Sequence, residues 1–237
     1  MSAAGLKVAE TFLSVQGEGK LTGVPSYFIR VSGCNLRCAW CDTPYASWKP
    51  EGGSRPVESL AREAIASGAR HVVLTGGEPM IFEEIGVLTE RLRAGGMHVT
   101  VETAGTVFRD VACDLLSLSP KLANSTPGEG DPRDVGGRWR VLHEERRINL
   151  AALRELMEHY PERQLKFVVS RTEDLHEIEA LLAQLKGWKP DEVLLMPEGV
   201  TPALAQTRQW LVTECVARGW RYCHRLHIEL FGNVRGT

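Results

Sequence analysis

The sequence contains no uninterrupted apolar stretch approaching the roughly 20 residues of a membrane-spanning helix. Its first residues also lack a basic segment followed by an apolar run, so they do not resemble a secretory signal. We therefore expect a cytoplasmic protein with no membrane partner. In that compartment thiols stay reduced, and clustered cysteines are metal ligands or catalytic groups more often than disulfides.

The chain also has little net charge, only -2 over 237 residues. It therefore has no global basic field that would attract nucleic acid, and we expect no direct nucleic-acid partner. Internal repeats and low-complexity tracts are absent as well. The length allows one large domain or two small ones, and a single domain over residues 1–237 is the simpler expectation.

What the sequence does contain is a regular alternation of short apolar runs with helical patterns. The apolar runs predict strands at residues 8–15, 26–32, 71–75, 97–102, 114–119, 165–170, 193–196 and 221–228. The helical patterns lie at residues 56–67, 82–94, 146–159, 174–185 and 202–218. This alternation predicts βαβ units and a mostly parallel sheet.

A complete eight-fold barrel typically needs about 250 residues. This chain also contains a cysteine loop at residues 33–54 and a polar, Gly- and Pro-rich segment at about residues 123–137 that predicts an exposed loop. The remaining length is sufficient for about six strand–helix units. We therefore predict an α/β fold with an incomplete, open (β/α)6-type barrel.

The chemistry begins in the cysteine loop, where Cys34, Cys38 and Cys41 follow a predicted strand with the spacing CxxxCxxC. Three close thiolates repel one another unless a cation holds them, and cysteine thiolates are the usual ligands of iron–sulfur clusters. Only three cysteines share the loop, so one iron of a cubane cluster would stay open to another ligand. Structural zinc would need a fourth ligand, such as Asp42. The remaining cysteines, Cys113, Cys215 and Cys223, are expected to be buried core thiols.

The spacing CxxxCxxC resembles the signature of the radical S-adenosylmethionine (SAM) superfamily. The resemblance implies a 4Fe–4S cluster whose open iron is chelated by SAM, and an electron from the cluster that cleaves SAM to an adenosyl radical. The segment TGGEP (residues 75–79) fits this assignment, because two glycines let the backbone approach a ligand and the helix start that follows offers free N–H groups. It resembles the superfamily's GGE motif, which binds the methionine amino group.

Further segments resemble one narrower family. These are QGEG (residues 16–19), Arg30, CDT (residues 41–43) and the C-terminal HIELFGNVRG (residues 227–236). Together they resemble the 7-carboxy-7-deazaguanine synthase family of queuosine and deazapurine biosynthesis, over nearly the whole chain.

This resemblance implies a lyase that converts 6-carboxy-5,6,7,8-tetrahydropterin to 7-carboxy-7-deazaguanine and releases ammonia. It implies Mg²⁺ in addition to the cluster and SAM, which is regenerated in each turnover. It further implies an electron donor such as flavodoxin or ferredoxin and a homodimer. The product would feed tRNA modification or a deazapurine natural product.

The resemblance also assigns roles to individual residues. The substrate-binding residues it implies are Val15, Gln16, Gly17, Glu18, Arg30, Thr75, His227 and the C-terminal Thr237. Those implied for SAM are Gly76, Gly77, Glu78, Glu102, Ser119, Pro120, Lys121, Met196, Pro197, Glu198 and Gly199. The metal ligands are Cys34, Cys38 and Cys41 for the cluster and Thr43 for magnesium.

Two alternatives stay open at this point. A glycyl-radical activating enzyme would share CxxxCxxC and GGE but lack the pairing of QGEG with CDT. A non-catalytic iron–sulfur protein would enclose its cluster fully and need no GGE segment. For His227 a bonded histidine in a strand competes with the substrate role, and for Arg30 a strand-edge charge paired with a nearby Glu does.

Overall fold

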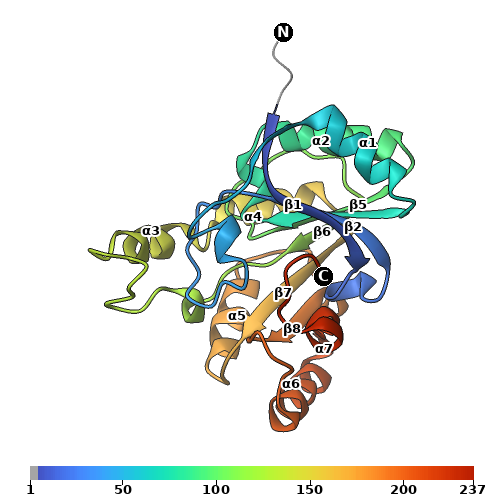
Figure 1. Cartoon of the computed structure of the whole chain (residues 1–237). Coiled ribbons are helices and arrows are strands. Elements are labelled where there is room, and N and C mark those ends of the chain that lie inside the picture. Colours follow the sequence, from blue (N-terminus) through green and yellow to red (C-terminus); the bar gives the residue numbers. More distant parts are fainter. Residues whose placement is uncertain (1–4) are drawn as a thin grey trace.

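The computed structural model describes residues 5–237, which form one nine-stranded sheet with helices along its length (Figure 1). The strand order is β3-β1-β2-β4-β5-β6-β7-β8-β9. The strands are β1 (Gly5–Val15), β2 (Pro25–Val31), β3 (Gly53–Pro56), β4 (His71–Gly76), β5 (His98–Thr103), β6 (Leu115–Leu118), β7 (Arg163–Val169), β8 (Val193–Pro197) and β9 (Arg221–Tyr222). Every pairing from β2 to β9 is parallel, whereas β1 is antiparallel to both β2 and β3. The predicted α/β fold with an open, mostly parallel sheet is confirmed.

The helices are α1 (Val57–Ala66), α2 (Glu84–Ala94), α3 (Arg138–Arg146), α4 (Leu150–His159), α5 (Asp174–Leu182), α6 (Ala205–Arg218) and α7 (Leu226–Phe231). They follow β3, β4, β6, β7, β8 and β9, but the described connection from β5 to β6 contains no helix. The chain therefore departs from a regular series of six strand–helix units at this connection. Within residues 5–237, every helix is too short or too polar to span a bilayer.

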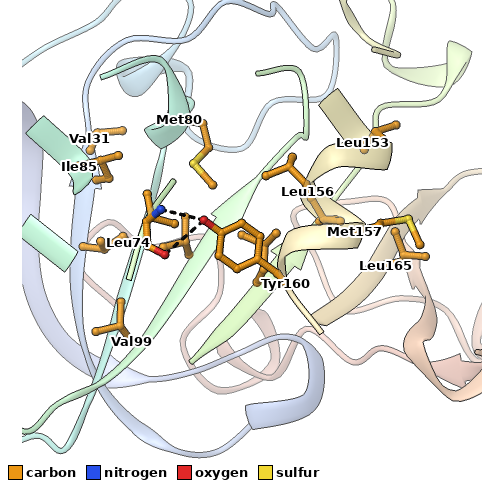
Figure 2. Packing of buried hydrophobic residues seen from close by; sticks show 14 of the residues in the cluster. Val31, Leu74, Met80, Ile85, Val99, Leu153, Leu156, Met157, Tyr160 and Leu165 are labelled. Atoms are coloured by element: carbon orange, nitrogen blue, oxygen red, sulfur yellow. Dashed lines mark hydrogen bonds between the residues drawn. The ribbon is translucent and has the colours of Figure 1, made fainter. Parts of the chain in front are cut away.

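One hydrophobic cluster fills the space between the sheet and its helices. The strands contribute alternate residues to it, such as Leu165 and Phe167 of β7, whereas Lys166 between them lies on the opposite face. Figure 2 shows part of it, with Leu74 and Val99 from the sheet on one side of the Tyr160 ring and Leu156 of α4 on the other. Tyr160 is the polar member of this group. Its hydroxyl accepts from the backbone N–H of Val111 at 2.7 Å, so the ring is buried without an unpaired oxygen.

One predicted element begins later than expected and another was wrong. The predicted helix at residues 146–159 is α4, which begins only at Leu150 because the Asn149 side chain caps it by accepting from Ala152 N at 3.2 Å; α3, which ends at Arg146, was not predicted. The predicted strand at residues 221–228 is extended only in β9, and α7 begins at Leu226. Apolar residues predicted a strand there, but the backbone N–H of Leu226 bonds to Gly17 O at 2.9 Å and turns the chain onto the end of β1.

The polar segment at residues 123–137 contains only a short 3-10 turn, Ala123–Ser125, so the predicted loop is confirmed. It packs against the cysteine loop, since Ala39 N donates to Ser125 O at 2.7 Å. His143 of α3 completes the contact. One ring nitrogen accepts from Arg37 N at 3.1 Å and the other pairs with the Ser125 hydroxyl at 2.9 Å. The segment after β6 thus supports the loop that holds the three cysteines.

Candidate active site

A cavity of about 460 Å³ lies at the C-terminal ends of the parallel strands. This edge of a parallel sheet is where barrel active sites are built. Strands β1, β2, β4, β5, β7 and β8, the cysteine loop, α7 and the C-terminal tail (residues 232–237) all contribute side chains to it. The predicted site residues among its lining are Val15, Gln16, Gly17, Glu18, Arg30, Cys34, Cys38, Cys41, Thr43, Thr75, Gly76, Gly77, Glu102, Ser119, Lys121, Met196, His227 and Thr237.

Five predicted SAM-binding residues do not line this cavity: Glu78, Pro120, Pro197, Glu198 and Gly199. Glu78 is buried beneath it, where its carboxylate accepts from Thr103 Oγ1 at 2.6 Å, Ala104 N at 2.8 Å and Met80 N at 3.0 Å. Burial raises the pKa of Glu78, and these hydrogen bonds offset part of that rise. The observed contacts of Glu78 thus join the turn after β4 to the end of β5.

The cysteine loop brings all three thiols to one wall of the cavity. Hydrogen bonds from side chains to the backbone stabilise the loop, since Arg37 Nη1 donates to Cys34 O at 2.8 Å and Trp48 Nε1 donates to Cys38 O at 2.9 Å. None of the three thiols forms a disulfide. Free thiols on the rim of a cavity are the donor set that an iron–sulfur cluster takes.

Burial raises the pKa of the Cys34 thiol to about 12 and also raises that of Cys38. A bound cation must therefore displace these protons, which couples cluster binding to thiol ionisation. Within the described residues, no three His, Cys, Asp or Glu side chains are grouped around the position of a single ion. A cubane cluster needs no such convergence, because each thiolate binds a different iron. The three cysteines therefore fit a cluster.

The TGGEP turn lies directly against the start of the cysteine loop. Glu78 N donates to Gly33 O at 2.9 Å, and a Cβ at Gly77 would lie 1.8 Å from the same oxygen. Only glycine fits at Gly77 without moving one of the two backbones. The absence of side chains at Gly76 and Gly77 also leaves their backbone at the cavity wall, where a ligand can approach it.

Glu102, at the end of β5, joins residues predicted for the substrate and for SAM. Its carboxylate accepts from Gln16 Nε2 at 3.1 Å and from Thr75 Oγ1 at 2.7 Å. At the end of β6, Lys121 Nζ donates to Ser119 Oγ at 2.8 Å, and both side chains line the cavity. The segments at the ends of β1, β4, β5 and β6 therefore present hydrogen-bonding groups to the same cavity.

Glu18 is at the centre of a buried ion-pair network that the sequence did not predict. Lys166 of β7 donates to its Oε2, Arg225 Nε donates to Oε1 at 3.2 Å, and His227 Nε2 lies 4.0 Å from Oε1. Burial opposes ionisation of Glu18, but the charges of Lys166 and Arg225 outweigh it and hold the pKa of Glu18 well below its usual range. Burial also lowers the pKa of His227. Arg225 Nη2 also donates to Asp42 Oδ2 at 2.5 Å. We refer to Glu18, Lys166, Arg225 and Asp42 as the inner network.

His227 lies in α7 and lines the cavity, so its assignment to a strand was wrong. Its ring packs over the turn after β1, where a Cβ at Gly17 would come within 1.9 Å of Nδ1. Gly17 is therefore required for this close approach. The contact brings α7 to the same turn that carries Gln16 and Glu18.

A second network lies at the rim, around Glu10 of β1. Glu10 Oε1 accepts from Arg30 Nε and from the Tyr45 hydroxyl, both at 2.7 Å, and Oε2 accepts from Arg235 Nε at 3.1 Å. Arg235 also donates to Glu51 at 2.8 Å and lies over the Tyr45 ring, 4.1 Å from its centroid. We refer to Glu10, Arg30, Tyr45 and Arg235 as the rim network.

The rim network ties the C-terminal tail to β1 through Arg235, and residues 232–237 of the tail line the cavity. Arg30 is both paired with a Glu and part of the cavity lining, so the two readings of this residue are compatible. Its Nη nitrogens have no hydrogen-bond partner among residues 5–237 and remain available to an anion.

Other lining residues escaped sequence reasoning. Phe12 and Phe28 stack with centroids 4.9 Å apart, and Trp40, Tyr45 and Lys166 complete the wall. Only Lys166 left a clear signal, as the one charged residue in the predicted strand at residues 165–170. The expectation for the remaining cysteines is confirmed for Cys215 and Cys223, which are buried, whereas Cys113 is only partly buried and packs against the core.

Comparison with known proteins first defines the class. The family model described as the Radical SAM superfamily matches residues 28–185, a span from β2 to just beyond the end of α5. The structure of Streptococcus suis SuiB bound to S-adenosylmethionine shares the fold, with a TM-score of 0.52 at 12% identity over 80% of this chain and 47% of that one. The chain is therefore a member of the radical SAM superfamily.

Similarity over the full length is more specific. The 7-carboxy-7-deazaguanine synthase of Rhodopirellula baltica is 49% identical, covering 100% of this chain and 90% of the relative. That of Halobacterium salinarum is 46% identical, covering 98% and 93%. The crystal structure of QueE from Escherichia coli has a TM-score of 0.69 at 28% identity, covering 94% and 95%. The chain belongs to the 7-carboxy-7-deazaguanine synthase family of radical SAM enzymes.

Proposed function

We propose that the chain converts 6-carboxy-5,6,7,8-tetrahydropterin to 7-carboxy-7-deazaguanine with loss of ammonia. The observation that supports this most is the shared cavity, in which the three cysteines, the TGGEP turn and the QGEG turn face one space. A protein that only carries electrons has no need of such a space beside its cluster. A bound cluster and SAM supply the radical that starts the reaction, and the residues of this chain bind and orient the substrate.

Arg30 is the proposed partner of the substrate carboxylate. Glu10 holds Nε at 2.7 Å, which fixes the plane of the guanidinium and leaves its Nη nitrogens toward the cavity. A planar fork fixed in this way suits a carboxylate. Val15, Gln16, Gly17, Thr75 and His227 are proposed to contact the pterin ring.

For SAM we propose the part of the cavity that is lined by residues at the ends of β4, β6 and β8. Lys121 and Ser119 offer a cation and a hydroxyl for its carboxylate and ribose, and Gly76 and Gly77 offer backbone. Met196 also lines the cavity and is proposed to pack against the adenine. Glu78, Pro120, Pro197, Glu198 and Gly199 lie outside the cavity lining, so we propose that they support the lining residues from behind.

For magnesium we propose Thr43, whose hydroxyl lies 3.8 Å from the Cys41 sulfur at the cavity wall. A hydroxyl oxygen is a hard donor, and substrate oxygens and water can complete the coordination. The carboxylate of Thr237 lies in the tail that lines the cavity and is proposed to approach the substrate.

Several wider expectations also remain proposals. A single domain is supported by the hydrophobic cluster that runs from Leu6 to Trp220. An external one-electron donor such as flavodoxin or ferredoxin follows from the need to reduce the cluster. A homodimer, a cytoplasmic location and a product used for tRNA modification or for a deazapurine natural product rest on the family resemblance.

Arg30→Gln tests the substrate assignment. Charge-assisted hydrogen bonds contribute about 1.5–3 kcal/mol, so KM for the carboxypterin should rise roughly 10- to 100-fold. SAM cleavage in the absence of substrate should be unchanged. An unaltered KM would contradict the proposed role of Arg30.

Cys38→Ala tests the cluster assignment. Reconstituted protein should lose the cluster absorbance and all turnover, while Cys113→Ala should keep both. Turnover that survives the loss of the cluster would contradict radical chemistry altogether.

A further inference from the structure

Arg225, between β9 and α7, bonds to three separate segments of the cavity wall. Its Nε donates to Glu18 Oε1 at 3.2 Å, its Nη2 donates to Asp42 Oδ2 at 2.5 Å, and its Nη1 donates to Gly199 O. The side chain is only 11% exposed. All three nitrogens of one planar group are therefore engaged away from solvent.

Each of these partners belongs to a different part of the proposed site. Glu18 lies in the turn proposed to hold the substrate, and Asp42 stands between the cluster ligand Cys41 and the proposed magnesium ligand Thr43. Gly199 ends the segment that begins with Met196 at the adenine side. One guanidinium thus connects the substrate turn, the metal loop and the SAM segment.

The geometry of arginine makes this connection stiff. Its donors are fixed in one plane, so three simultaneous hydrogen bonds determine the relative positions of the three acceptors. Lysine has a single charged nitrogen and cannot reproduce the arrangement. Because Asp42 and Thr43 are consecutive, fixing the Asp42 carboxylate restricts where the Thr43 hydroxyl can lie.

The two carboxylates do not depend on Arg225 equally. Glu18 keeps Lys166 as a second cation, whereas Arg225 is the one cation paired with Asp42 among residues 5–237. Loss of Arg225 should therefore disturb the metal loop more than the substrate turn. The Asp42 side chain is 39% exposed and would be free to move.

We propose that Arg225 is a positioning residue that holds Thr43 and the turn after β1 in register, and so couples metal binding to substrate binding. This inference depends on the proposed function, because it takes Thr43 as the metal ligand and Glu18 as part of the substrate turn. Arg225 lies outside the cavity lining and acts through Asp42 and Glu18.

The test is a titration with Mn²⁺, in place of Mg²⁺, followed by electron paramagnetic resonance on cluster-loaded protein with SAM and carboxypterin. Arg225→Gln should weaken Mn²⁺ binding about tenfold or more, as expected for loss of a charge-assisted hydrogen bond. KM for the carboxypterin should rise by a smaller factor, and iron content should not change. Asp42→Asn should weaken Mn²⁺ binding in the same direction, and its effect should not add to that of Arg225→Gln.

Arg221→Gln is the matched control, since Arg221 is exposed on β9 and its side chain has no hydrogen bond or ion pair among residues 5–237. It should bind Mn²⁺ as the wild type does. Arg225→Lys keeps the charge and should preserve folding and the cluster while restoring Mn²⁺ affinity only in part. Full restoration by lysine would overturn the proposal, because charge alone would then be sufficient.

Thr43→Val tests the proposed magnesium site separately from the positioning role of Arg225. If Thr43→Val weakens Mn²⁺ binding and Arg225→Gln does not, the positioning role is wrong and the magnesium site stands. If Thr43→Val has no effect, the proposed magnesium site is wrong and the coupling falls with it. Tighter Mn²⁺ binding by Arg225→Gln would also overturn the proposal, since Arg225 would then compete with the metal for Asp42.

Discussion

The inner network and the rim network each join distant segments of the chain around one central carboxylate, Glu18 in the turn after β1 and Glu10 in β1. The two carboxylates are similarly shielded, Glu18 at 14% and Glu10 at 12% exposure. Their cations differ. Lys166 is 6% exposed in the inner network, whereas Arg235 is 45% exposed at the rim.

Because of this difference in the exposure of their cations, we assign a structural role to the inner network and a role in closing the cavity to the rim network. Breaking a buried ion pair leaves an uncompensated charge in the interior, while an exposed pair is screened by water and contributes little. We therefore expect the inner network to determine whether the cavity forms, and the rim network to determine how tightly it closes over a ligand.

The largest effect should come from Lys166→Met. It leaves Glu18 with Arg225 alone in the interior, and removal of one partner from a buried pair typically costs about 3–5 kcal/mol. Urea unfolding of the cluster-free protein measures the loss. Lys20→Met is the control, because Lys20 forms an exposed pair with Glu162 whose loss should cost about 0–1 kcal/mol. Equal costs for the two variants would remove the distinction between buried and exposed pairs.

Acidification should weaken the inner network by protonating Glu18. The folded-state pKa of Glu18 is held below its unfolded value, so the unfolded chain binds the extra proton as pH falls. The resulting stabilisation is complete above about pH 4.5 and is lost as pH falls toward the folded pKa. The free energy of unfolding of the wild type should therefore decrease below that pH. Glu18→Gln should flatten this decrease, and an unchanged acid slope would contradict the assigned pairing.

Glu10→Gln should have a smaller effect on stability and a clear effect on binding. Arg30 and Arg235 lose their shared anion, but both stay partly solvated, so unfolding should change by about 1 kcal/mol. The Arg30 guanidinium is no longer held in one plane, and KM for the carboxypterin should rise severalfold with little change in kcat. A fall in kcat at constant KM would indicate that Glu10 takes part in a chemical step.

Arg235→Ala should have the smallest effect. It removes the contacts of the tail to Glu10 and Glu51 while leaving Arg30 paired with Glu10. KM should rise about two- to fivefold, and the tail should become more sensitive to carboxypeptidase, as expected for a segment with few remaining contacts. An identical digestion rate would show that other contacts hold the tail.

The sequence predicted the parts of the site that are contiguous. Cys34, Cys38 and Cys41 share one loop, and TGGEP ends one strand, so the local sequence predicts a cluster site, and the resemblance of these motifs to the radical SAM superfamily implies its chemistry. The parallel strands were also predictable, because strands buried on both faces form continuous apolar runs. The short β3 was not, since Gly53–Pro56 contains no apolar run and pairs only with the start of β1.

The two networks could not be predicted for a different reason. A pairing such as Glu18 with Arg225 joins residues at opposite ends of the chain, and nothing local indicates which carboxylate a given arginine reaches. The same holds for α7, whose apolar residues favour a strand until the contact between Leu226 and Gly17 redirects the chain. Lys166 is the intermediate case, because a charge inside an apolar strand already indicates a buried partner.

The most direct test of the central claim is a product assay with the anaerobically reconstituted protein. The protein is given reductant, SAM and 6-carboxy-5,6,7,8-tetrahydropterin, with and without Mg²⁺, and product and ammonia are quantified together. We expect 7-carboxy-7-deazaguanine and ammonia in equal amounts, with faster turnover when Mg²⁺ is present. Retention of the cluster and cleavage of SAM without a deazaguanine product would contradict the assignment and favour an activating enzyme that acts on another protein.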